Sequence, residues 1–180
     1  VRAGLYDLHS HKLVHVAEAP YATQYPQLGW AEQAPADWWT ALGKACRQLM
    51  AQAGHPQVAA VCVATTASTV VVAQADGQPL APALLWMDCR AAAESARTAH
   101  VSHPMMNQGG DAVEWLVPKA MWLAEHEPQV YQRAERICEA VDWINFQLTG
   151  RWVASQLNAS CKWNYDTLQQ RFPVELYAEL

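Results

Sequence analysis

Short apolar segments and longer amphipathic segments alternate along this 180-residue chain, and their order restricts the fold more than any other sequence feature. Residues 58–64 are a run of small and β-branched apolar side chains, which predicts a strand buried on both faces, as in a parallel or mixed sheet. Residues 69–74 and 137–141 predict two further strands. Residues 37–53 predict a helix, because their apolar side chains recur on one face. Strands that alternate with helices indicate an α/β fold, with a mixed sheet flanked by helices.

Four further elements fit this architecture. Residues 1–19 predict a β-hairpin that is broken by a polar turn. Residues 88–100 predict a helix capped by Asp88, and residues 114–127 and 143–149 predict two more helices. No repeat or low-complexity tract divides the chain, so the sequence predicts a single domain.

Composition excludes several classes of protein. Hydrophobic residues make up 52% of the chain and charged residues only 16%, so the chain can bury a core and disorder is not expected. The net charge of -5 and the scattered basic residues indicate neither nucleic acid nor a membrane as a partner. No apolar run reaches the length of about 18 residues that a membrane span needs. The five cysteines are odd in number and form no CxxC pair, which indicates reduced thiols in a cytoplasmic protein: Cys46, Cys62, Cys89, Cys138 and Cys161.

Three segments, in their order and spacing, resemble the FGGY family of carbohydrate kinases. The first is residues 29–39 (GWAEQAPADWW), which resemble the stretch that follows the opening β-strands of that family. The second is residues 82–90 (PALLWMDCR), which match its P-x-x-x-W-x-D-x-R pattern. The third comprises residues 114–123 and 142–150. These matches run through most of the chain, so the chain resembles the N-terminal, sugar-binding domain of the family.

The resemblance implies an actin-like ATPase fold of the ribonuclease H type, in two domains, with ATP and sugar meeting in the cleft between them. In that family an Asp-x-Gly-Thr strand precedes the residues that match Val1, and the catalytic aspartate belongs to a C-terminal nucleotide-binding domain. Residues 1–180 are therefore expected to be a sugar-binding domain truncated at both ends. The full-length protein would be a phosphotransferase that uses ATP and Mg²⁺. The fragment alone would be inactive, with no catalytic or metal-binding residue and neither cofactor bound.

The first candidate sugar-binding residues are Thr66, Ala67 and Ser68, which lie between two predicted strands. Small side chains there would let a polyol approach the backbone, and the hydroxyls can donate or accept hydrogen bonds. An ordinary polar turn explains the same residues, but the resemblance aligns Ala67 and Ser68 with the family's substrate-contact segment. Asp88 and Arg90 are the next candidates. They could form a charge-assisted pair that shapes the cleft, or instead a helix N-cap and a surface arginine.

Glu114 and Lys162 complete the candidate set. Glu114 could place a carboxylate on sugar hydroxyls beside the Trp115 indole, or it is an acid at a helix start, favoured by the helix dipole. Residues 160–163 (SCKW) resemble the ribulose-kinase branch of the family, in which a lysine at this position reaches the substrate. The alternative for Lys162 is a solvated side chain on a loop. Residues 66–69, Glu114 and Lys162 are therefore predicted to surround one common hollow that receives a polyol.

The resemblance leaves more than one function open. Xylulose kinases usually carry Met-His in place of Ala67 and Ser68, and glycerol kinases carry an Arg-Glu pair that is absent here. The expected substrate is therefore a five-carbon ketose or polyol, such as ribulose or ribitol, with xylulose or glycerol as alternatives. A non-catalytic sugar-binding or interaction module is a second alternative. The tryptophan-rich segments argue against another actin-fold ATPase. An apolar face that a second domain would cover could also pair two copies as a homodimer.

Overall fold

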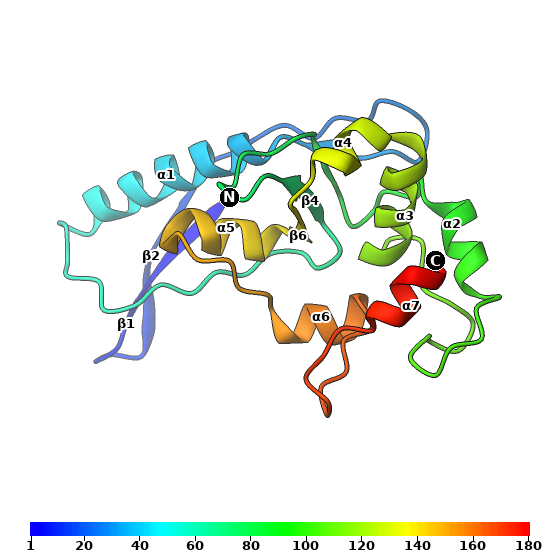
Figure 1. Ribbon diagram of the computed structural model, residues 1–180. Coiled ribbons are helices and arrows are strands. Elements are labelled where there is room, and N and C mark those ends of the chain that lie inside the picture. Colours follow the sequence, from blue (N-terminus) through cyan, green and yellow to red (C-terminus); the bar gives the residue numbers. More distant parts are fainter.

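The computed structural model describes residues 1–180 as two small β-sheets and seven helices (Figure 1). The first sheet is an antiparallel hairpin of β1 (Arg2–Asp7) and β2 (Lys12–Glu18), which confirms the predicted hairpin. The second sheet has the strand order β3-β5-β4-β6, and every pairing in it is antiparallel. Its strands are β3 (Glu32–Gln33), β4 (Val70–Ala73), β5 (Ala83–Leu84) and β6 (Arg136–Glu139).

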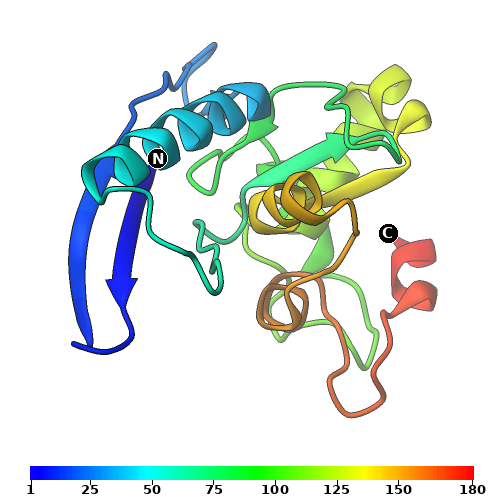
Figure 2. The same ribbon diagram turned by 90° about the vertical axis from the view of Figure 1, so that its left-hand side faces the viewer.

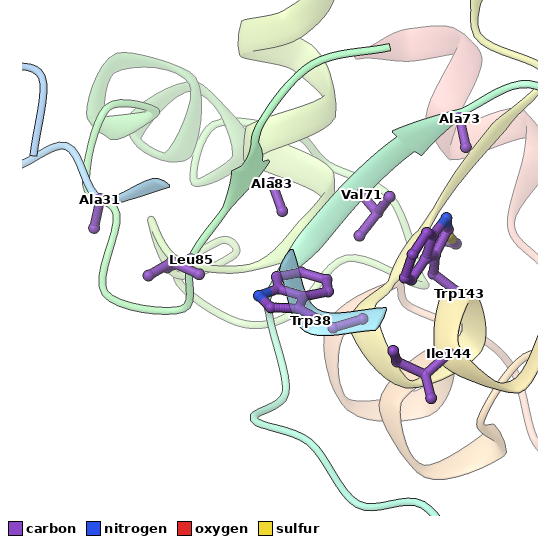
Figure 3. Close-up of a cluster of buried hydrophobic side chains, with 10 residues drawn as sticks. Ala31, Trp38, Val71, Ala73, Ala83, Leu85, Trp143 and Ile144 are labelled. Carbon is purple, nitrogen blue, oxygen red and sulfur yellow. The ribbon is translucent and has the colours of Figure 1, made fainter. Parts of the chain in front are cut away.

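One face of the second sheet is covered by α1 (Pro35–Gln52) and α5 (Ala140–Thr149). Side chains alternate along a strand, and Val71 of β4 points to this face. It packs with Trp38 of α1 and Trp143 of α5, whose indoles meet edge to face with ring centroids 6.1 Å apart (Figure 3). This apolar cluster fixes both helices on the sheet.

The opposite face is covered by α3 (Leu116–His126), whose Trp122 packs with Val70 of β4. The shorter helices α2 (Ala92–Thr98) and α4 (Pro128–Arg133) lie against α3. Helices on both faces of a sheet confirm the predicted α/β architecture. The sheet was predicted to be mixed, but all of its pairings are antiparallel. None of the seven helices combines the length and the apolar character that crossing a bilayer requires.

The hairpin and α1 lie side by side at one end of the molecule (Figures 1 and 2). Ala19, just after β2, packs there with Ala41 and Ala45 of α1. The C-terminal helices α6 (Gln156–Lys162) and α7 (Val174–Glu179) lie away from the hairpin and are drawn below the second sheet in Figure 2.

Two further expectations from the sequence are wrong. Residues 58–64 form no strand, and side chains such as Val61, 73% exposed, meet solvent. A doubly buried strand needs hydrogen-bonded neighbours, and no strand of the structure pairs with this segment. The second error concerns α2, which begins at Ala92. Asp88 does not cap it, because the Asp88 carboxylate is hydrogen-bonded to Arg90 and to a distant backbone amide.

Gly77 occupies a turn in which only glycine fits. Its φ is +84°, and its carbonyl accepts a hydrogen bond from the Trp143 indole at 2.9 Å. A Cβ there would lie 2.7 Å from Cδ1 of Phe146. Gly77→Ala is therefore expected to lower the free energy of unfolding by about 2–4 kcal/mol, through the left-handed backbone and the displaced ring together. Urea denaturation measures this loss.

Gly54→Ala is the matched control for Gly77→Ala. Gly54 has a similar φ of +71°, but no atom lies within 4 Å of the position that a Cβ would take. The control therefore carries only the cost of the left-handed backbone. Equal losses in the two variants would contradict the steric part of the argument.

Candidate functional site

The segment that enters β4 is held by its backbone. Ser68 is buried and has a φ of +68°. Its carbonyl accepts a hydrogen bond from Nζ of Lys119 at 2.8 Å. Thr66 is exposed and Ala67 is half-buried. These two residues are therefore the accessible part of the segment.

Lys119 of α3 is fully buried and joins two loops. Its Nζ donates to the carbonyl of Ser68 at 2.8 Å and to the carbonyl of Leu85 at 2.6 Å. The first carbonyl lies before β4 and the second follows β5, so one ammonium group fixes both loops. Burial lowers the pKa of Lys119 to about 8, although the nearby carboxylates of Asp88 and Glu139 act in the opposite direction.

Glu139 ends β6 and is also fully buried. Its Oε1 accepts a hydrogen bond from the Trp163 indole at 3.3 Å, and its Oε2 has no hydrogen-bond partner. Burial raises the pKa of Glu139 to about 7, while the hydrogen bond from the Trp163 indole acts in the opposite direction. Because the protein encloses this carboxyl group, it holds neighbouring segments in place and is not open to a ligand.

Asp88 and Arg90 form a charge-assisted pair inside the protein. The Asp88 carboxylate accepts hydrogen bonds from Nε of Arg90 at 2.9 Å and from the N–H of Ala31 at 2.7 Å. Nη2 of Arg90 lies 2.7 Å from both Asp88 Oδ2 and Glu32 Oε1. The guanidinium group also stacks on Trp30, 3.7 Å from the ring centroid. Both charged groups therefore have partners inside the protein, and neither lies on the surface.

Glu114 lies just before the start of α3, and Lys162 lies at the end of α6. Lys162 is the last residue of α6, and its Nζ lies 4.5 Å from the centroid of the Trp115 ring. Glu114 precedes Trp115, which is the N-cap residue of α3. Both charged side chains are half-buried, and neither forms an ion pair with another side chain. Their charges are therefore available to a ligand.

Contacts connect the three regions that were predicted to act together. The carbonyl of Thr69, next to Ser68, accepts a hydrogen bond from the N–H of Ala140 at 2.9 Å. The residue before Ala140 is Glu139, whose carboxylate accepts from the Trp163 indole. Trp163 directly follows Lys162, whose ammonium group lies over Trp115. The structure thus places the Lys162 cation against the Trp115 indole, while one shared sugar site that also includes Thr66 and Glu114 stays a prediction. Such a set can hydrogen-bond to a polyol and pack against its C–H groups.

Two surface hollows lie elsewhere on the molecule. One is lined by the loop of residues 99–109, and the other by residues 34–36 and 78–82. None of the predicted sugar-binding residues lines either of them. The common hollow predicted from the sequence is therefore not one of these two.

Sequence reasoning missed Lys119 and Glu139, which organise this neighbourhood. Lys119 interrupts the apolar run 116–123, and Glu139 ends a strand whose neighbours are apolar. A charged residue inside an apolar segment is the signal that could have found them, because a buried charge needs partners.

Comparison with known proteins gives a consistent result. Residues 1–178 match the model of the N-terminal domain of the FGGY family of carbohydrate kinases. A ribulokinase from Bacillus licheniformis is 29% identical over 168 residues, which are 82% of this chain and 30% of that protein. A glycerol kinase from Thermococcus gammatolerans is 29% identical over 175 residues, 88% of this chain and 34% of that protein. The crystal structure of xylulose kinase from Rhodospirillum rubrum matches with a TM-score of 0.88 and 27% identity, over 98% of this chain and 38% of that one.

These matches cover nearly all of the chain but only part of each relative. The chain spans about a third of the length of the curated relatives it matches. The similarity to the solved xylulose kinase confirms the actin-like fold that the resemblance implied. Since the family model covers residues 1–178, the chain belongs to the FGGY family of carbohydrate kinases.

Proposed function

We propose that the full-length protein transfers the γ-phosphoryl group of ATP to a hydroxyl of a five-carbon ketose or polyol, such as ribulose or ribitol. Residues 1–180 would form its sugar-binding domain. The observation that supports this most is the position of Lys162 over Trp115, the residue that directly follows Glu114 in the sequence. The reaction class is taken from relatives named ribulokinase, glycerol kinase and xylulose kinase.

Each accessible group would have a part in holding the sugar. The Lys162 ammonium would donate a hydrogen bond to a sugar oxygen, and the Glu114 carboxylate would accept from hydroxyls. The Trp115 face would pack on C–H groups. Thr66 and Ala67 would let the sugar approach the backbone.

Asp88 and Arg90 would act indirectly. They are buried and bonded to each other, so they would keep the loop after β5 in position without touching the sugar. Lys119 would hold the same loop from the other side, through the carbonyl of Leu85.

The nucleotide phosphates would be held by residues beyond this chain. Gly109 and Gly110 are adjacent but form a turn, in which the N–H of Gly110 donates to the carbonyl of Asn107 at 2.9 Å. No glycine-rich loop in residues 1–180 leaves a strand and opens a helix, which is the usual phosphate cradle. MgATP supplies the phosphoryl group, and its transfer depends on positioning and charge neutralisation. Residues 1–180 alone are therefore expected to bind sugar without turnover.

Lys162→Met in the full-length protein tests the sugar contact. It is expected to lower kcat/KM for ribulose by about 10–100-fold, the loss that one charged hydrogen bond accounts for. The free energy of unfolding should change little, because Lys162 forms no ion pair. Lys44→Met, on the exposed face of α1, is the matched control and should change neither quantity. An unchanged kcat/KM in Lys162→Met would exclude the role assigned to this lysine.

The substrate class is tested on the wild-type protein with ribulose, ribitol, xylulose and glycerol. The highest kcat/KM for ribulose or ribitol supports the proposal. A preference for xylulose would replace the ribulose assignment within the five-carbon class, and a preference for glycerol would overturn that class. Binding of a sugar without phosphorylation of any would favour the non-catalytic module.

A further inference from the structure

A second group of ionisable side chains lies where α2 contacts α3, outside the proposed sugar-binding residues. Glu94 of α2 is 2% exposed, which is unusual for a carboxylate. Its Oε2 is shielded from solvent and has no hydrogen-bond partner. Its Oε1 lies 3.8 Å from Nδ1 of His126. A buried ionised carboxylate is strongly disfavoured unless a positive charge compensates it, so Glu94 lacks a strong partner.

His126, at the end of α3, is oriented as metal-binding imidazoles are. Its Nδ1 lies 3.1 Å from the carbonyl of Trp122, which can only accept a hydrogen bond. The neutral ring therefore carries its proton on Nδ1. The ring also stacks on Trp122, with centroids 4.9 Å apart and planes within 7°. These contacts fix the imidazole and leave the lone pair of Nε2 available to an ion.

Glu125 supplies a third ligand atom. One carboxylate oxygen of Glu94, one of Glu125 and one ring nitrogen of His126 lie within 4.8 Å of one another. Nη2 of Arg97 lies 2.5 Å from one oxygen of Glu125, which leaves the second oxygen free. Two carboxylates against one guanidinium keep the group negative when both are ionised, and this favours a cation.

We propose that Glu94, Glu125 and His126 bind one divalent transition-metal cation such as Zn²⁺. An imidazole together with carboxylates suits Zn²⁺, whereas Mg²⁺ prefers oxygen ligands alone. Bonds of about 2.0–2.2 Å in a tetrahedral site place two ligand atoms roughly 3.4 Å apart. Ligand atoms that lie within 4.8 Å of one another must therefore close by up to roughly 1.4 Å. Glu125 is exposed at a helix end, so its side chain can rotate to make this shift. The site does not depend on the proposed kinase activity.

The test uses the full-length protein, treated with EDTA and free of nucleotide. Co²⁺ is titrated first, because its visible absorption reports its ligands and a thiolate ligand adds a separate intense band. The expected result is one Co²⁺ per chain without the thiolate band, followed by displacement with Zn²⁺. The band matters because four cysteines are exposed and could bind the ion instead.

Four variants locate the ion. Glu94→Gln and His126→Ala are each expected to weaken Co²⁺ binding by at least about 100-fold. The exposed neighbours Glu127→Gln and His100→Ala should keep the wild-type affinity. Circular dichroism shows whether the variants fold. If Glu94→Gln does not fold, the Co²⁺ affinity of the surface variant His126→Ala tests the site. Absence of saturable binding, a thiolate band, or wild-type affinity in His126→Ala would overturn the proposal and leave an ion-pair cluster only.

Discussion

Asp88→Ala is expected to lower the free energy of unfolding by about 3–5 kcal/mol, because it leaves a buried charge without its main partner. Asp88 is 0% exposed, and its carboxylate accepts hydrogen bonds from Arg90 and from the N–H of Ala31. In the variant, the Arg90 guanidinium would stay buried with Glu32 as its remaining ion partner. Urea denaturation followed by circular dichroism measures the loss.

A second ion pair with a similarly short contact provides the control. Arg2 Nε lies 2.6 Å from Glu18 Oε1, but the two side chains are 75% and 59% exposed. Because solvent screens such a pair, Glu18→Ala should cost little. If Asp88→Ala cost no more than Glu18→Ala, burial would not be what makes the Asp88 pair important.

The double variant Asp88→Leu with Arg90→Met separates the pair from its surroundings. Removing both partners leaves neither Asp88 nor Arg90 as an isolated buried charge, so its loss should be smaller than the sum of the two single losses. An additive result would show that the two side chains act independently, against the hydrogen bonds between them.

The helices were more predictable from the sequence than the sheet. The apolar pattern of α1 is local, so the predicted span 37–53 lies close to the observed helix Pro35–Gln52. The helix begins two residues earlier than predicted, at Pro35, which fits there because the first turn of a helix does not need its missing N–H. The apolar run 58–64 indicates a tendency to be buried, but the partners of a strand come from distant parts of the chain. No such partner pairs with it in residues 1–180, so the local pattern alone misplaced a strand.

The candidate site shows the same limit. Asp88 was expected as a helix cap because the rule for caps is local. In the structure its carboxylate instead accepts hydrogen bonds from the side chain of Arg90 and from a backbone N–H that is 57 residues away. Lys119 bonds to a carbonyl 51 residues away, a contact that no local pattern contains. The candidate residues could be chosen from the sequence, whereas their burial and partners required the fold.

Lys119→Met is expected to lower the free energy of unfolding by about 3 kcal/mol. Methionine has a similar length but cannot donate hydrogen bonds, so the carbonyls of Ser68 and Leu85 would lose their donor inside the protein. Glu139 would lose a nearby cation at the same time. For a domain of this size the melting temperature should fall by roughly 6–12 °C. Lys44→Met, at an exposed position of α1, should leave it almost unchanged.

The pH dependence of stability identifies the charges behind this effect. Burial raises the pKa of Glu139 from 4.5 to about 7, so the folded state holds this proton more tightly than the unfolded chain does. The free energy of unfolding therefore falls by ~3 kcal/mol as the pH rises from 4.5 to 7. Burial lowers the pKa of Lys119 from 10.5 to about 8, so the unfolded chain holds that proton more tightly and stability rises between pH 8 and 10.5. Glu139→Gln should remove the fall, and Lys119→Met should remove the rise. Urea denaturation across this range compares the three proteins, and identical profiles would mean that neither group titrates in its buried position.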